Sequence, residues 1–323
     1  MKKLIFSILF LTRMFHAYSQ QEAQFSQYIF NGLYINPAYA GYKEEMYTQM
    51  FYRSQWIGVE GAPKTLAASI DGASESKNVG MGLLISYDAI GAQSNMSAYA
   101  NYAYRLQIGK DESSRLSFGL GFGAIQAGID GSKLTSIDGN DNLVPTNTQS
   151  SLLPDARAGI FFSNKRMFAG FSATNLLAQY FMNGKDNNLK SLVPKLHYYF
   201  TAGAIFQTSP DVAVKPSFLL KDDDSGPTSL DLNLFFLFKN RVWLGGFYRT
   251  SVKLYEKPYL PDALAKSNAM GIITELFATE KLRLGYSFDY SLNRLQNNNY
   301  GAHEVSLGYY FSKKKSRELK CFF

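Results

Sequence analysis

The stretch SRLSFGLGFGAIQAG, residues 114–128, decides the fold class. Large apolar side chains stand at every second position, and small or polar residues fill the positions between them. The apolar set is Leu116, Phe118, Leu120, Phe122 and Ala124, and the small or polar set is Ser117, Gly119, Gly121 and Gly123. A period of two is that of a β-strand, whose successive side chains point to opposite faces. The stretch therefore predicts a strand with one apolar face and one small, polar face.

The same alternation recurs along the chain of 323 residues, for example in KLRLGYSFDYS (281–291) and SLDLNLFFLFK (229–239). Each run is about ten residues long, the length that a tilted strand needs to cross a bilayer. About fourteen such runs are present, beginning near Met46, Lys64, Asn78, Ser94, Ser114, Ala156, Arg166, Lys195, Val212, Thr228, Arg241, Ser267, Lys281 and Gly301. They predict an all-β fold, an antiparallel transmembrane β-barrel of about 14 strands.

The links between these runs alternate in length. The short ones lie at 109–113, 163–165, 209–210, 240 and 279–280, and the longer ones near 129–155, 175–194, 221–227, 250–266 and 291–300. Outer-membrane barrels have short periplasmic turns and longer extracellular loops. The pattern therefore predicts both termini in the periplasm, since the strand number is even.

Aromatic residues make up 15% of the chain, with 22 Tyr and 25 Phe. Membrane barrels carry aromatic girdles at both bilayer interfaces. The alternatives are a soluble β-sandwich and a lipocalin-like barrel. Either fold would bury its apolar face and show a smaller aromatic excess. We therefore expect an outer-membrane location, with lipid as one partner.

The two ends of the chain differ from the barrel. Residues 1–19 predict a signal peptide, with Lys2 and Lys3 before a short apolar core and small residues at the end. Residues 20–45 predict a periplasmic lead-in segment, 46–312 the barrel and 313–323 a basic tail. The net charge of +7 lies mainly in the signal and the tail, so the body is close to neutral and we expect no nucleic-acid face.

The lead-in contains QFSQYIFNGLYINPAYAG, residues 24–41. Phe25, Tyr28, Ile29 and Leu33 fall at helical spacing, which predicts a short amphipathic turn or helix. Asn36-Pro37 is expected to end it, because a residue before proline avoids the α region. We expect the segment to pack on the barrel mouth or tuck into it; a disordered linker is the alternative.

Catalytic and metal-binding patterns are missing from the sequence. His197 and His303 lie over 100 residues apart, and no His, Cys or Asp cluster has zinc spacing. A Ser-His hydrolase in the wall lacks any motif that places a nucleophile beside a base. Residues 138–142 resemble a calcium loop without its closing Glu, so a polar loop is expected there. We expect no enzyme, no cofactor and no metal site.

Two sets of residues remain as candidates for partner contact or for a structural role. Residues 55–63, QWIGVEGAP, predict either an interface-anchoring Trp56 before a Gly/Pro turn or a binding loop. Arg53, Arg105, Arg249 and Arg283 are expected to face the lumen. Their expected partners are Asp71, Asp88 or Asp289. Such a charge ladder would stiffen the barrel or give a small pore an anion preference.

An ordered set of fragments resembles the PorP/SprF family of type IX secretion proteins. The set runs NPAYAG (36–41), YRSQWIGVEGAPKT (52–65), SID (69–71), GMGLLISYDAIG (80–91), YAYR (102–105), LSFGLGFG (116–123), WLGGFYR (243–249), LRLGYSFDYS (282–291) and GAHEVSLGYYF (301–311). The motif residues taken as candidates are Asn36, Pro37, Ala38, Gly41, Arg53, Gln55, Trp56, Gly58, Gly61 and Pro63.

The resemblance implies an outer-membrane accessory barrel of type IX secretion or gliding motility, without catalytic residues. SprF-like members support surface delivery of a large secreted protein, whereas PorP-like members associate with periplasmic components of the apparatus; both roles stay open. A passive channel is the alternative function, because the Gly- and Ser-rich inner face would leave room in the lumen.

Overall fold

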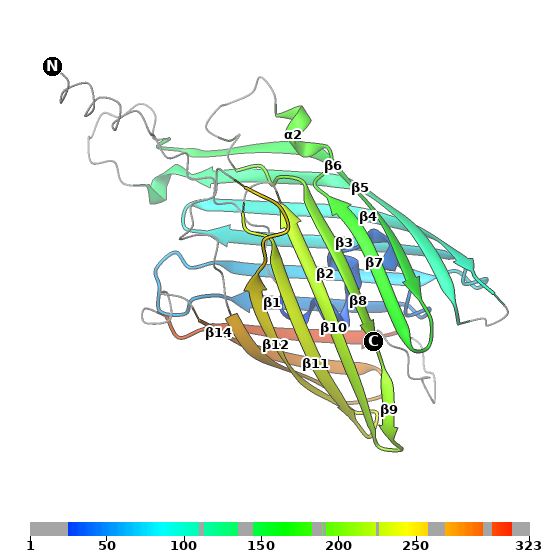
Figure 1. The fold of residues 1–323 in the computed structure, drawn as a ribbon. Helices are drawn as coiled ribbons and strands as arrows, with labels where there is room; N and C mark the ends of the chain where they lie inside the picture. The colour runs from blue at the N-terminus through cyan, green and yellow to red at the C-terminus, as the bar shows by residue number, and fades with distance from the viewer. Residues whose placement is uncertain are drawn as a thin grey trace.

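The computed structural model describes residues 25–109, 113–134, 145–182, 189, 192–223, 226–257, 269–292 and 299–311. Its strands form one antiparallel sheet in which each strand pairs with the next, and the pairing of β10 with β11 and of β15 with β1 closes it into a barrel (Figure 1). β8 and β9 both pair with β10 and are separated only by Ile205, so the barrel has fourteen strands. The predicted fold class is confirmed.

The strands are β1 (Tyr47–Ser54), β2 (Lys64–Ala73), β3 (Val79–Ile90), β4 (Gln93–Gln107), β5 (Arg115–Asp130), β6 (Thr148–Ser163), β7 (Met167–Thr174), β8 (His197–Ala204), β9 (Phe206–Ser209), β10 (Val212–Asp223), β11 (Ser229–Phe238), β12 (Val242–Ser251), β13 (Ala269–Phe277), β14 (Leu282–Ser291) and β15 (Ala302–Tyr310). Short helices are η1 (Gln27–Phe30), η2 (Gly32–Tyr34), η3 (Pro37–Tyr39), η4 (Gly131–Lys133) and α2 (Ala178–Phe181).

All but one of the predicted strand starts lie within two residues of the observed ones. The prediction for β6 was wrong: the strand begins at Thr148 rather than near Ala156. Pro154 and its polar neighbours obscured the pattern. β6 pairs with β5 over its whole length but with β7 only from Ala158, so Pro154 lies where one edge has no paired strand in the registers described. Sheets tolerate proline at such an edge.

The apolar face of the alternation points outward. Leu120 in the middle of β5 is 52% exposed, whereas Ser117, on the opposite face of the same strand, is buried in the interior. The exterior of the barrel therefore carries the large apolar side chains, as a lipid-facing wall requires. Among the residues described, no helix is long and apolar enough to cross a membrane.

The two ends of the barrel differ, and we name them by their links. The short-turn end has the links 74–78, 108–114, 164–166, 210–211, 239–241 and 278–281. The long-loop end has 55–63, 131–147, 175–196, 224–228, 252–268 and 292–301, together with one tight turn at Gly91–Ala92. The predicted alternation of link lengths thus holds except at that turn and at 224–228, whose five residues are fewer than the seven of 108–114.

The N-terminal segment lies inside the lumen. Residues 25–43, which we call the plug, form η1, η2 and η3, and almost every side chain in them is buried (Figure 1, dark blue). Asn31 and Asn36 cap η2 and η3, since each side chain accepts a hydrogen bond from the N–H two residues on. The helical turns are confirmed, but Asn36-Pro37 begins a third one, because proline suits the first helical position.

The plug runs along the lumen from one end to the other. Ser26 contacts Arg53 and Glu304, which lie at the long-loop ends of β1 and β15. Gly41 contacts Asp71 and Arg105 near the short-turn end. The described chain therefore starts near the long-loop end and finishes at Phe311 at the short-turn end. The predicted signal peptide, the tail, the 138–142 loop and the position of both termini fall outside the described residues.

The outward apolar face can be tested by placing a charge on it. Leu120→Arg is expected to lower the free energy of unfolding in lipid vesicles by about 2–4 kcal/mol, because Leu120 is central in the outward apolar run of β5. Leu152→Arg is the control: Leu152 is 71% exposed but lies opposite Gln126, beyond that run, and its cost should be below about 1 kcal/mol. Denaturant titration of the two folded variants measures the difference; equal costs would contradict a lipid-facing wall at Leu120.

Candidate functional site

A track of glycines on the inner wall lets the plug backbone approach closely. A Cβ built at Gly119 of β5 would overlap the backbone of Ala38, and one at Gly80 of β3 would overlap the carbonyl of Ala40. The small side chains that the sequence predicts on the inner face therefore do not leave the lumen empty. It provides the space that the plug occupies, because only glycine permits backbone contact at this distance.

The motif NPAYAG forms the central contact between plug and wall. Asn36 Nδ2 donates to the Ile160 carbonyl (3.0 Å), and its Oδ1 accepts from Ala38 N (2.9 Å). Gly41 has φ +72°, and its N–H donates to Asp71 (2.9 Å). Four of the predicted motif residues, Asn36, Pro37, Ala38 and Gly41, are therefore brought together against the wall.

A buried ion network holds the plug near the long-loop end. Arg53 is 2% exposed and lies 2.5 Å from Asp289 and 3.0 Å from Glu304. The N–H groups of Ser26 and Gln27 donate to Glu304 (2.9 and 3.0 Å), and the Ser26 hydroxyl donates to Asp289 (2.6 Å). The plug thus supplies hydrogen bonds that these buried carboxylates need.

The other predicted lumen arginines have their shortest contacts with groups outside the predicted set, although Arg249 also forms a longer ion pair with Asp289. Arg249 pairs with Asp231 at 2.7 Å and approaches Asp289 only to 4.0 Å. Arg105 donates to the Gly41 carbonyl, and Arg283 pairs with Glu275 at 2.9 Å. The pairing predicted for Arg53 with Asp289 is confirmed. Glu275, the partner of Arg283, lies outside the predicted set, and Asp88 accepts a hydrogen bond from Thr65.

Lys43 anchors the short-turn end of the plug. Its ammonium donates to the Phe30 carbonyl (3.0 Å) and lies 3.5 Å from the centre of the Tyr47 ring. Burial lowers the pKa of Lys43 well below its usual range, and the nearby charge of Arg283 acts in the same direction.

Aromatic contacts fill the space between plug and wall. Ring centroids are 4.8 Å apart for Tyr34 and Phe51, and 5.5 Å apart for Phe30 and Phe235. Such pairs add to the energy of apolar burial. They also explain why Phe235 interrupts the polar face of β11 in the sequence: it packs on the plug rather than facing water.

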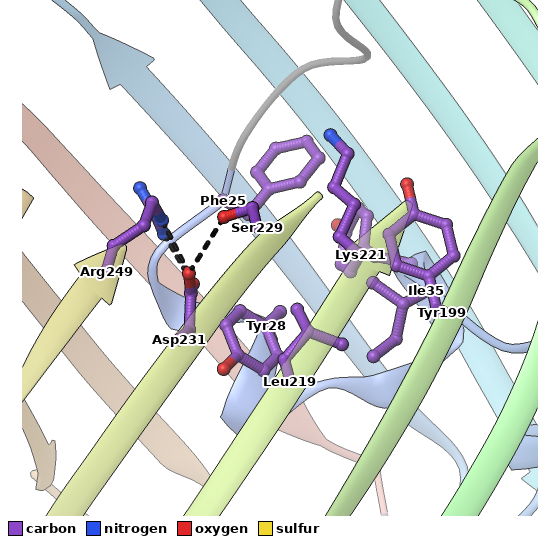
Figure 2. Close-up of a pocket in the computed structure, with 10 residues that line it drawn as sticks. Phe25, Tyr28, Ile35, Tyr199, Leu219, Lys221, Ser229, Asp231 and Arg249 are labelled. Carbon is purple, nitrogen blue, oxygen red and sulfur yellow. Dashed lines mark hydrogen bonds and ion pairs between the residues drawn. The ribbon is translucent and has the colours of Figure 1, made fainter. Parts of the chain in front are cut away.

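One small cavity, of about 40 Å³, remains beside the plug near the long-loop end. Figure 2 shows Asp231 joined to Arg249 and Ser229, with Phe25, Tyr28 and Ile35 of the plug among the side chains around the cavity. A volume of this order holds a water molecule or two. Its lining residues are Phe25, Tyr28, Tyr34, Ile35, Tyr199, Leu219, Lys221, Ser229, Asp231 and Arg249.

The predicted loop Gln55–Pro63 lies apart from the plug, at the long-loop end. Gln55 N donates to the Pro63 carbonyl (2.9 Å) and closes the loop. Trp56, Gly58 and Gly61 have φ of +46°, +95° and +70°, so the turn is tightly wound. The structure therefore confirms the Gly/Pro turn, and it separates these residues from Arg53, which belongs to the plug network.

The sequence did not single out three acidic residues of the inner wall, of which Glu304 accepts from the plug and the other two pair with wall arginines. Asp231, Glu275 and Glu304 stand on the small, polar faces of their strands, and that position was the available signal.

His197 lies 3.0 Å from Asp223, and His303 is hydrogen-bonded to Tyr286. Within the described residues, no group of three or more His, Cys, Asp or Glu side chains is placed to hold a metal ion.

The family profile described as "Type IX secretion system membrane protein PorP/SprF" matches residues 17–309. The chain belongs to the PorP/SprF family. The family assignment and the closed barrel together identify the chain as an outer-membrane protein of type IX secretion. None of the curated proteins matches it.

Solved structures similar to this PorP/SprF protein include other barrels. The Omp33 outer membrane protein of Acinetobacter baumannii is 7% identical, with a TM-score of 0.45, and covers 83% of this chain and 100% of its own. A FadL homologue of Pseudomonas aeruginosa is 8% identical, with a TM-score of 0.49 and coverage of 92% and 96%. The CymD monoaromatic hydrocarbon channel is 10% identical, with a TM-score of 0.49 and coverage of 88% and 93%.

Crowding the glycine track should loosen the plug. Gly119→Ala places a methyl group on the backbone of Ala38, and overpacking of this kind costs about 1–3 kcal/mol. We expect chymotrypsin to cut the plug of the folded protein roughly 5- to 150-fold faster, at Phe30, Tyr34 or Tyr39. Gly128→Ala is the control, since its Cβ would meet neighbours no nearer than 3.4 Å. Unchanged cleavage of Gly119→Ala would show that the plug is not held by this contact.

Removing Arg53 should destabilise the protein strongly. Arg53→Met leaves Asp289 and Glu304 buried without their shared cation, which we expect to cost about 3–5 kcal/mol of unfolding free energy. Lys253→Met, which breaks the exposed pair with Glu256, should change it by less than about 1 kcal/mol. Denaturant unfolding in the same detergent compares the two variants, and a loss for Arg53→Met as small as that of the control would refute the proposed role of the network.

Proposed function

We propose that this protein is an accessory barrel of the type IX secretion or gliding apparatus, and that it supports the export or surface attachment of a large secreted partner protein. In this proposal it acts as a docking platform rather than as a conduit. The observation that carries the distinction is the plug, whose glycine, hydrogen-bond and ion contacts reach from the long-loop end to the short-turn end of the lumen.

The family supports the connection with type IX secretion. In the orientation we propose, the long loops face the cell exterior and the short turns face the periplasm, as in other outer-membrane barrels. A secreted partner would then meet the long-loop end, where Ile57, Tyr180 and Tyr300 are exposed. Such scattered aromatic and aliphatic side chains suit contact with another protein.

A catalytic role is not part of this proposal. Both described histidines are engaged in contacts with neighbouring wall residues, His197 with the Lys195 carbonyl and Asp223, and His303 with Tyr286.

The partner function is tested in cells that lack the gene. We expect a large protein to disappear from the surface proteome of the deletion strain and to return with the wild-type gene. Complementation with Gly128→Ala should restore it as well, because that variant keeps the plug contact. If the surface proteome is unchanged by the deletion, the accessory role is refuted.

The alternative of a passive channel makes a separate prediction. The wild-type protein in a planar bilayer should show no steady conductance, because the plug occupies the lumen. A variant lacking residues 25–42 should conduct, since the inner wall it exposes is lined by small and charged side chains. Its circular dichroism spectrum must show that the barrel still forms. Steady conductance by the wild-type protein would favour the channel.

A further inference from the structure

Basic side chains gather on one arc of the short-turn end. The turns 164–166, 239–241 and 278–281 belong to strands β6 to β14, which are consecutive in the sheet. Five basic residues stand on this arc against two acidic ones, Asp211 and Glu280. The basic residues are Lys165, Arg166, Lys239, Arg241 and Lys281. Elsewhere on this end, the described charged residues that are not buried include three acidic ones, Glu44, Glu45 and Glu75, and one basic one, Lys77.

These cations lie at the border of the lipid-facing wall. Arg166 precedes the outward-facing Met167, which is 49% exposed, and Lys239 follows Phe238, which is 41% exposed. The Lys281 ammonium lies 5.7 Å from the centre of the Tyr309 ring and donates to the Phe311 carbonyl. Aromatic and basic side chains at the edge of an apolar wall mark the depth of the lipid headgroups.

The turn at 239–241 has a defined backbone from which its two cationic side chains extend. Lys239 and Asn240 have φ of +48° and +52°, the values of a tight hairpin turn of type I′. Lys239 N donates to the Asp211 carbonyl (2.7 Å), and Arg241 N donates to the Phe238 carbonyl (2.9 Å). Both side chains are exposed.

We propose that this arc, which we call the basic arc, binds the phosphate headgroups of anionic phospholipids in the leaflet around the short-turn end. The positive charge of the basic arc is opposite to that of the phosphate groups. The basic residues also lie at the depth of the lipid headgroups rather than at the mouth of the lumen. An acidic protein surface would be the other partner for such charge, but it would not require cations placed beside lipid-facing Met167 and Phe238. The inference does not depend on the proposed secretion role.

The test compares lipid retention by the full-length protein. Wild type is purified in detergent with an equimolar mixture of phosphatidylglycerol and phosphatidylethanolamine, and native mass spectrometry counts the lipids that stay bound. We expect wild type to retain phosphatidylglycerol preferentially. Lys239→Gln/Arg241→Gln should lower that preference about 5- to 25-fold, because each basic residue near an anionic surface strengthens binding about fivefold.

The matched control is Lys77→Gln. Lys77 lies at the same end, outside the basic arc, and pairs with Glu44 at 2.9 Å. Its substitution removes one positive charge from this end, against two in the double variant, and should leave the preference unchanged. Excess glycerol 3-phosphate should not displace the lipid, which separates a lipid site from a site for free phosphate. Equal retention of both lipids by wild type, or equal loss in the control and the double variant, would overturn the proposal. The double variant keeps Asn240 in the turn, and gel mobility of the unheated protein checks that it and the Lys77→Gln control fold.

Discussion

The close approach between the plug backbone and the glycines of the inner wall is the contact on which the interior depends. At Gly80 and Gly119 no side chain fits, since its first carbon would overlap the plug. This spacing allows Asn36 to reach the Ile160 carbonyl and Gly41 to reach Asp71. A bulkier wall would hold the plug away from these partners and leave their polar groups buried without hydrogen bonds, which is costly.

The buried charges follow from the same constraint. Glu304 and Asp289 lie in an interior that is closed to bulk water, so they need both Arg53 and the donors that the plug supplies. The plug therefore completes an ion network as well as filling space. Without the plug, these groups would line the lumen as a wall of charged side chains. The same residues are therefore compatible with two interpretations, a stiffened interior and a pore that the plug closes.

A barrel with a filled interior offers its two ends and its outer wall for interaction. The long-loop end carries a tightly wound loop at residues 55–63 with exposed apolar side chains near it, and the short-turn end carries an uneven ring of charge. The two ends therefore differ in chemistry as well as in link length.

The period-two alternation determined the barrel, its strand number and nearly all strand starts, because each strand crosses the membrane with one apolar face and this requirement is local. It failed at β6, where Pro154 sits on a strand edge without a paired neighbour. The plug's position was decided only in three dimensions. Ser26 meets Glu304 across 278 residues of sequence, and Gly119 reads as an ordinary small inner residue until Ala38 packs on it. Local pattern specifies which side of a strand faces lipid, whereas the contents of the lumen depend on contacts between segments that no local pattern connects.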